Sequence, residues 1–167
     1  GTSKIKNNKG IYSSGTGALL IYNRWFTLQK IMKLKLIEKY DRFIITRSDF
    51  LWNIHHPRME NLNPKYIWIP DGEKYGGYTD RHAVLSKNNL YDYLNLIEPI
   101  LLDPINLYNL MKSKNNWNLE RYIKLYLNQK GYSQKVKFFP YLMYSLRNSK
   151  IKTTFRPGEY SYKHKFF

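Results

Sequence analysis

The sequence contains no cysteine among its 167 residues, which excludes disulfide bonds, zinc–thiolate sites and cysteine nucleophiles. It also lacks any run of about 20 apolar residues, the length that a membrane-spanning helix needs. The start of the chain is polar and contains lysine without an apolar stretch, so we do not expect a secretory signal there. These absences predict a soluble, cytoplasmic protein, either free or held at the cytoplasmic face of a membrane by its charge.

Acidic residues are scarce, since 12 Asp and Glu stand against 28 Lys and Arg and leave a net charge of +16. Such a charge attracts polyanions, nucleotides, phosphorylated sugars or anionic lipid surfaces, and it does not indicate a fold. The hydrophobic content of 43% and the aromatic content of 17% are those of a globular protein rather than a disordered one. The chain is therefore expected to fold and to meet an anionic partner.

Apolar periodicity and turn residues predict a single α/β domain in which a central mixed sheet is flanked by helices. We expect a polar loop over residues 1–17, the domain itself over 18–147 and a basic, aromatic tail over 148–167. No segment repeats, and the length suits one hydrophobic core.

The expected helices are marked by apolar residues that recur at three- and four-residue steps. An amphipathic helix, broken once, is predicted over 18–39, with Arg24 among the basic residues of its solvated face. A second helical segment is predicted to end near Pro99. The clearest helix begins after Asn118 as its N-cap and stops at Gly131.

Short runs rich in aromatic and β-branched residues, bounded by turn residues, predict the strands. The run at 43–45 is predicted to be a buried strand, and 66–69 a second strand that stops at Pro70. Two shorter strands are predicted over 136–139 and 141–146. Helices and strands therefore alternate, as in α/β proteins.

Two charged residues, Arg47 and Asp49, follow the predicted strand at 43–45. In open α/β sheets ligands bind beyond the carboxyl ends of the strands, where such side chains can meet a charged ligand or a metal. A surface ion pair at the end of a strand explains the same two residues. Both interpretations stay open on the spacing alone.

A second polar cluster lies between two predicted strands. The paired glycines Gly76 and Gly77 are followed closely by Asp80, Arg81 and His82. Paired glycines let the backbone approach a ligand or adopt positive φ, and a carboxylate, a guanidinium and an imidazole then come together. An ordinary hairpin loop with turn glycines is the alternative, and the residues by themselves do not choose between the two.

The adjacent histidines His55 and His56 lie in a proline-bearing stretch between the two segments. Adjacent side chains of an extended chain point in opposite directions, so this pair is poorly arranged to chelate a metal. We expect both to be loop residues.

The two polar segments together form a more specific pattern than either alone. The first reads Y-D-x-x-I-x-T-R-S-D-F, and after a proline-bearing loop and a strand ending in I-P-D-G the second reads Y-G-G-x-T-D-R-H. This pattern resembles the glycosyltransferase-like domains of capsular-polysaccharide and lipopolysaccharide type, including some from giant viruses, which have a GT-A-like nucleotide-diphospho-sugar transferase fold. In that family a strand ends in R-x-D and a later segment reads G-G-x-x-D-R. The matching positions here are Arg47, Asp49, Gly76, Gly77, Asp80 and Arg81.

The resemblance implies transfer of a sugar from a nucleotide-sugar donor to a hydroxyl of a glycan acceptor. By analogy Asp49 would hold Mn²⁺ or Mg²⁺ on the donor diphosphate, and Arg47 would lie near phosphate or be structurally paired. Asp80 would be the catalytic carboxylate, which orients the acceptor or takes the proton from its hydroxyl. The remaining residues expected to bind substrate are Gly76, Gly77, Arg81 and His82.

The chain departs from the family in two ways. It contains no D-x-D motif, which weakens the implied dependence on a metal. A GT-A-like fold begins with a strand–helix–strand half that holds the nucleoside, whereas this chain starts at what looks like a middle helix. We therefore expect the N-terminal half of the fold to be absent.

Two alternatives belong to other functional classes. The net charge of +16 and the Lys-rich, aromatic tail suit a nucleic-acid-binding protein that neutralises phosphates and stacks bases. No helix-turn-helix, zinc-finger or RNP motif supports that alternative and the basic residues are scattered, so nucleic acid is not the partner we expect. The other alternative is a non-catalytic module that binds glycans or anionic surfaces through its Tyr and Trp side chains.

Overall fold

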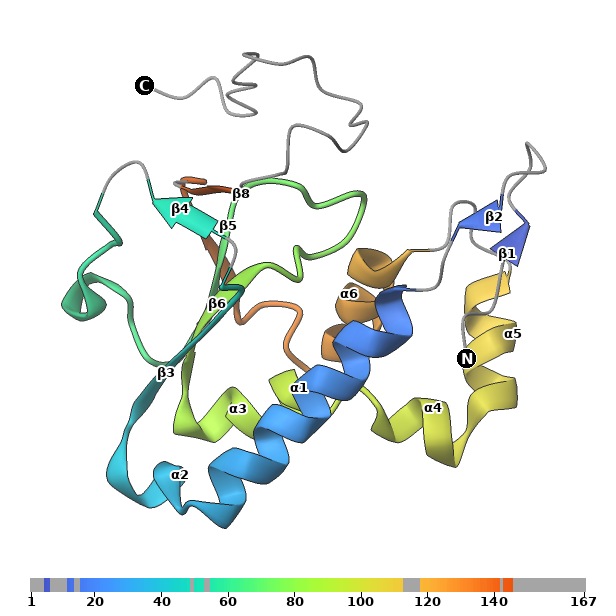
Figure 1. The fold of residues 1–167 in the computed structure, drawn as a ribbon, viewed down its shortest axis with the longest axis horizontal. Coiled ribbons are helices and arrows are strands. Elements are labelled where there is room, and N and C mark those ends of the chain that lie inside the picture. Colours follow the sequence, from blue (N-terminus) through green and yellow to red (C-terminus); the bar gives the residue numbers. More distant parts are fainter. Residues whose placement is uncertain are drawn as a thin grey trace.

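The computed structural model describes residues 5–6, 12–13, 16–48, 50–52, 55–112, 118–141 and 143–145. Within these ranges the chain has an α/β fold, with a four-stranded mixed sheet flanked by helices (Figure 1). The helices are α1 (Thr16–Lys33), α2 (Leu36–Lys39), α3 (Lys87–Leu94), α4 (Glu98–Leu102), α5 (Pro104–Lys112) and α6 (Leu119–Gln129), with a short 3₁₀ helix, η1 (Met59–Asn61). The strands are β1 (Ile5–Lys6), β2 (Tyr12–Ser13), β3 (Arg42–Thr46), β4 (Phe50–Trp52), β5 (Ile67–Pro70), β6 (His82–Ser86), β7 (Val136–Phe139) and β8 (Met143–Ser145).

The main sheet has the strand order β3-β6-β5-β7. Strand β6 is antiparallel to both of its neighbours, and β5 is parallel to β7. The carboxyl ends of β3, β5 and β7 therefore lie at the same edge of the sheet as the first residue of β6. Two small antiparallel pairs, β1-β2 and β4-β8, complete the described strands.

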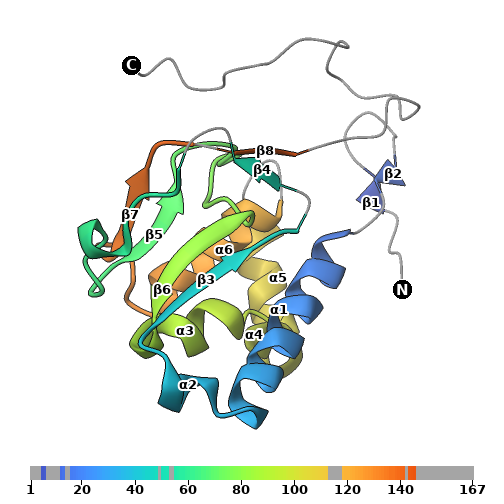
Figure 2. The same ribbon diagram turned by 60° about the vertical axis from the view of Figure 1, so that its left-hand side comes forward.

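The hydrophobic core lies between this sheet and the helices α1, α3 and α6, which cover one face of it (Figure 2). Side chains alternate between the faces of a strand, so Ala83 and Leu85 of β6 point into this core while His82 and Val84 point to the opposite face. The opposite face of β6 is nevertheless buried as well. This burial on both sides is consistent with the central position of β6 in the sheet.

The predicted helix over 18–39 is confirmed in type and in its single break. Helix α1 ends at Lys33 and α2 begins at Leu36, and between them Lys35 adopts a left-handed conformation with φ 53°. A residue other than glycine in that conformation cannot continue an α-helix, so the chain turns there. The short α2 then leads directly to β3.

The boundaries predicted for the clearest helix are also confirmed. The Asn118 side chain accepts a hydrogen bond from the Arg121 backbone N–H at 2.8 Å, which satisfies one of the amides that the first turn of α6 leaves without a partner. Gly131 follows the helix with φ 81°, a conformation that favours glycine. Both signals are local, which is why they can be recognised in the sequence.

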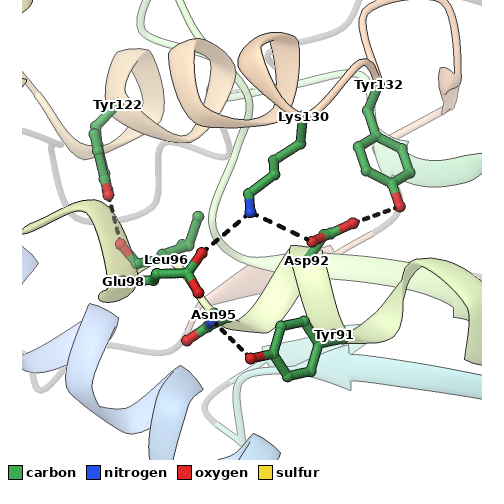
Figure 3. A network of polar contacts seen from close by, with 8 residues as sticks. All are labelled: Tyr91, Asp92, Asn95, Leu96, Glu98, Tyr122, Lys130 and Tyr132. Atoms are coloured by element: carbon green, nitrogen blue, oxygen red, sulfur yellow. Dashed lines mark hydrogen bonds and ion pairs between the residues drawn. The ribbon is translucent and has the colours of Figure 1, made fainter. Parts of the chain in front are cut away.

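A polar network anchors α6 to α3 and α4 (Figure 3). The Tyr122 hydroxyl donates a hydrogen bond of 2.5 Å to the Leu96 carbonyl, inside the protein. At the end of α6 the Lys130 ammonium lies 3.1 Å from the Glu98 carboxylate, and the Tyr132 hydroxyl donates to Asp92 at 2.8 Å. Helix α6 is thus held near its start by Tyr122 and just beyond its end by Lys130 and Tyr132.

Three predictions about these elements are wrong. The strand predicted at 43–45 does form, as β3, but it is not fully buried: among the described strands only β6 pairs with it, and Ile44 is 47% exposed while Phe43 and Ile45 pack against the core. Pro99 does not end a helix but lies in the first turn of α4, where its missing N–H costs nothing, and the residues after it are helical. Arg24 is not on a solvated face, since it is only 8% exposed within α1.

The strand predictions at 66–69, 136–139 and 141–146 are confirmed as β5, β7 and β8, with small shifts at their ends. Most of the polar loop at 1–17 and all of the tail at 148–167 lie outside the described residues. The domain boundaries therefore remain predictions.

Candidate functional site

The pairing of β3 with β6 brings the two polar segments of the sequence to one edge of the sheet. Thr46, the last residue of β3, pairs with His82, the first residue of β6. Arg47 therefore leaves this edge directly after β3, and Arg81 arrives at it directly before β6. The sequence predicts this meeting only if the two strands are neighbours, and the observed strand order makes them so.

The loop between β5 and β6, residues 71–81, contains Gly76 and Gly77 and is called the glycine loop below. It packs on the first turn of α6. The backbone N–H of Tyr78 donates to the Glu120 carbonyl at 3.0 Å, and the Asn118 side chain donates to the Tyr75 carbonyl at 2.8 Å. A Cβ atom on Gly77 would overlap the backbone of Glu120. Gly76 has φ 85°, and a Cβ there would lie 2.7 Å from the Arg121 guanidinium.

This packing gives both glycines a structural reason that needs no ligand. Gly77 permits the close approach of two backbones, and Gly76 supplies a positive φ in the turn. The role in binding substrate that the sequence suggests for them is a separate matter and stays a prediction.

The backbone of Asp80 is held by a buried arginine on α1. The Arg24 guanidinium donates to the Asp80 carbonyl at 2.9 Å and to the Tyr93 hydroxyl at 3.2 Å, and it lies 4.7 Å from the centre of the Tyr93 ring. Its second terminal nitrogen, Nη1, is buried without a hydrogen-bond partner among the described residues. Arg24 thus connects α1 and α3 to the loop that carries the predicted catalytic carboxylate, which is itself half-buried.

In the sequence Arg24 resembles the exposed lysines of α1, although it is buried in the structure. Its position alone did not indicate a buried partner. The Tyr93 and Asp80 groups that receive its hydrogen bonds come from segments far along the chain.

The loop also contains an ion pair between Arg81 and Glu73, whose side chains are 14% and 10% exposed. The Tyr141 hydroxyl lies 3.5 Å from the Glu73 carboxylate. Burial is the main cause that raises the pKa of Tyr141 to about 12, and the negative charge of Glu73 is the second. Burial likewise raises the pKa of the Glu120 carboxyl; the charges of Asp80 and Glu73 add to this effect, while Arg81 opposes it. The charged side chains of this loop therefore act on the Glu120 carboxyl in the first turn of α6.

His82 is 1% exposed and lies within a cluster of rings. Its Nε2 atom is 3.2 Å from Nε2 of His56, and the rings of Trp52 and Phe139 lie edge-on to it with centroids at 5.0 Å and 5.7 Å. Burial, and then the charge of His56, lowers the pKa of His82 to about 3. His82 is therefore a neutral imidazole at physiological pH.

His56 lies in a loop, as predicted, but its contact with His82 was not predicted. In the sequence His56 has only His55 as a neighbouring histidine, whereas the residue that it faces in the structure begins β6. No local signal distinguishes the two neighbouring histidines.

Two further predicted residues, Arg47 and Asp49, follow β3 in the sequence. The Arg47 guanidinium lies 5.5 Å from the centre of the Phe50 ring. Asp49, the predicted metal ligand, lies outside the described residues. Among the described residues no group of three or more His, Cys, Asp or Glu is arranged to hold a metal ion, and a Mn²⁺ or Mg²⁺ site that involves Asp49 stays a prediction.

No protein-family model, curated protein or solved structure matches this chain. Its function must therefore be argued from its own residues. None of the helices in the described ranges has the length and apolar character needed to cross a membrane.

Proposed function

We propose that this chain is a glycosyltransferase-like domain that transfers a sugar from a nucleotide-sugar donor to a hydroxyl of a glycan acceptor. The proposal is carried by the meeting of its two polar segments at one edge of the sheet, where Thr46 pairs with His82. Ligands of open α/β sheets bind at the carboxyl ends of the strands, and three strands of this sheet end at that edge. The net charge of +16 supports an anionic donor, because it raises the local concentration of diphosphates.

In this proposal each side chain has a definite task. The Asp80 carboxylate takes the proton from the acceptor hydroxyl, and Arg24 holds the backbone of Asp80 in place. The Arg47 guanidinium attracts the donor phosphates, while the ion pair with Glu73 fixes Arg81 within the loop. A Mn²⁺ or Mg²⁺ ion on Asp49 would neutralise charge on the leaving diphosphate.

The decisive experiment is a thermal-shift and turnover panel of sugar nucleotides, each with and without Mn²⁺. A ligand that binds only the folded state raises the melting temperature, so the true donor should produce a shift. Asp80→Asn should lower the rate of transfer or hydrolysis by about 100-fold or more, because general-base catalysis contributes that much. The shift with donor should persist in this variant, since Asp80 acts on the acceptor.

Asp103→Asn is the matched control. The Asp103 carboxylate accepts a hydrogen bond from the Asn106 backbone N–H at 3.2 Å, at the start of α5, and an asparagine oxygen can replace it. We expect wild-type turnover in this variant. If no sugar nucleotide shifts the melting temperature or is turned over, the proposal is wrong. A shift only with duplex DNA, lost as the salt concentration rises, would instead identify a nucleic-acid-binding protein.

A further inference from the structure

Two imidazoles from distant parts of the chain face each other on the side of the sheet opposite the helices. His56 lies in the loop after β4 and His82 begins β6, and their Nε2 atoms are 3.2 Å apart. The centroid of the Trp52 ring lies 5.4 Å from that of the His56 ring and 5.0 Å from that of the His82 ring. The Phe139 ring also contacts both imidazoles. The rings of Trp52 and Phe139 thus pack against both imidazoles, while His56 remains partly exposed to solvent.

The hydrogen bonds determine which nitrogens carry protons. His56 Nδ1 lies 2.7 Å from the Pro57 carbonyl, which can only accept, so Nδ1 carries the proton and Nε2 of a neutral His56 presents a lone pair. His82 Nε2 then donates to that lone pair, and His82 Nδ1 is buried without a partner among the described residues. The contact with Pro57 is the type of outer hydrogen bond that orients a histidine ligand of a metal.

The separation of the two Nε2 atoms suits a metal ion between them. Zinc–nitrogen bonds of 2.0–2.1 Å at a tetrahedral angle place two ligand nitrogens about 3.3 Å apart. The observed distance of 3.2 Å is close to this value, so the two rings would have to turn toward a shared metal ion but would not have to move apart. Imidazole ligands favour Zn²⁺, Ni²⁺ and Cu²⁺, whereas Mg²⁺ and Mn²⁺ prefer carboxylate and other oxygen ligands.

We propose that Nε2 of His56 and Nε2 of His82 together bind one divalent transition-metal ion of the Zn²⁺, Ni²⁺ and Cu²⁺ class. With two protein ligands the ion keeps open coordination positions, which water or an exogenous ligand fills. The site differs in its ligands and in its preferred metal from the Mn²⁺ or Mg²⁺ site predicted at Asp49. It does not depend on the proposed sugar transfer, because it rests on the histidine geometry alone.

Metal binding rearranges one proton and releases none from a neutral pair. The proton on His82 Nε2 moves to Nδ1 of the same ring, which frees the Nε2 lone pair for the metal. His82 Nδ1 has no acceptor among the described residues, and the loss of such an outer partner weakens metal sites about 10- to 100-fold. We therefore expect Zn²⁺ to bind more weakly here than at a site whose histidine ligands both have an outer hydrogen-bond partner.

The test is calorimetric titration of the tag-free, chelator-treated protein with Zn²⁺, followed by electron paramagnetic resonance with Cu²⁺. We expect one Zn²⁺ per chain and nitrogen hyperfine splitting from two imidazoles on Cu²⁺. His56→Gln should weaken Zn²⁺ binding at least tenfold. His56 is half-buried in a loop, so this variant should retain the fold, which circular dichroism checks.

His55→Gln is the matched control, because it changes the neighbouring exposed histidine and leaves the pair intact. It should bind Zn²⁺ as the wild type does, and so should His164→Gln, which removes the remaining histidine outside the pair. His82→Gln should lose binding like His56→Gln. The proposal is overturned if Zn²⁺ does not bind at concentrations up to about 1 mM, or if His56→Gln binds as tightly as His55→Gln.

Discussion

The close contact between the glycine loop and α6 makes Gly77→Ala the most informative change in stability. The new methyl group would overlap the backbone of Glu120, in the first turn of α6. Neither side can yield easily, because Tyr78 N–H donates to the Glu120 carbonyl at 3.0 Å and the Asn118 cap holds the same turn. The loop would have to move off the helix.

The expected cost follows from these contacts. Overpacking in a well-packed region costs about 1–3 kcal/mol, and an obstacle made of backbone lies at the upper end of that range. Losing the hydrogen bond between Tyr78 and Glu120 adds about 1 kcal/mol. We therefore expect Gly77→Ala to lower the free energy of unfolding by about 3–4 kcal/mol.

Two other glycines provide matched controls in urea unfolding followed by circular dichroism. Gly131 has φ 81° but open space around it, so Gly131→Ala should cost only the strain of a left-handed alanine, about 1–2 kcal/mol. Gly17 is within α1 and a Cβ there would make an ordinary contact of 3.9 Å, so Gly17→Ala should be neutral or stabilising by about 0.5 kcal/mol. If Gly77→Ala is no more destabilising than Gly131→Ala, the packing argument is refuted.

Three further predictions concern buried polar groups. Arg24→Met removes the hydrogen bonds to the Asp80 carbonyl and to a buried tyrosine, and should cost about 2–4 kcal/mol in urea unfolding; an unchanged midpoint would contradict it. Because the pKa of His82 is lowered to about 3, the unfolded chain takes up a proton below pH 6.5 while the folded one does not. The free energy of unfolding of the metal-free protein should therefore fall by up to about 1.4 kcal/mol per pH unit as the pH is lowered from 6.5 to 3. Thermal melts of His82→Gln should lack this contribution. If the stability of the wild type and of His82→Gln falls equally steeply with decreasing pH, the assignment to His82 is refuted. Tyr122→Phe leaves the Leu96 carbonyl without its buried donor and should cost about 1–3 kcal/mol, whereas an unchanged melting temperature would show that the hydrogen bond contributes nothing.

Local signals explain the parts of the fold that could be predicted. The Asn118 cap, the terminal Gly131 and the periodic apolar residues between them define α6, because capping and helical spacing involve residues within one or two turns. The strands at 67–70 and 136–139 were predictable for the same reason, since β-branched and aromatic residues are bounded there by turn residues. The exposure of Ile44 was not predictable, because it depends on which strand is outermost in the sheet.

The candidate site divides in the same way. The sequence by itself determined that two polar segments follow or precede strands, and that a pair of glycines lies in one of them. Only the tertiary structure decided that Thr46 pairs with His82, and it is this pairing that brings the segments to one edge. Strand order depends on packing across the whole sheet, so no short stretch of sequence contains it.

Burial of polar groups was decided entirely by the tertiary structure. Arg24 resembles its lysine neighbours in the sequence, yet its partners come from another helix and from the glycine loop. His56 resembles His55, yet only His56 meets His82, at 3.2 Å. The sequence specifies the chemical type of each side chain. Its burial and its hydrogen-bond partners are decided when distant segments pack together, because desolvation and hydrogen bonding depend on every group that surrounds the side chain.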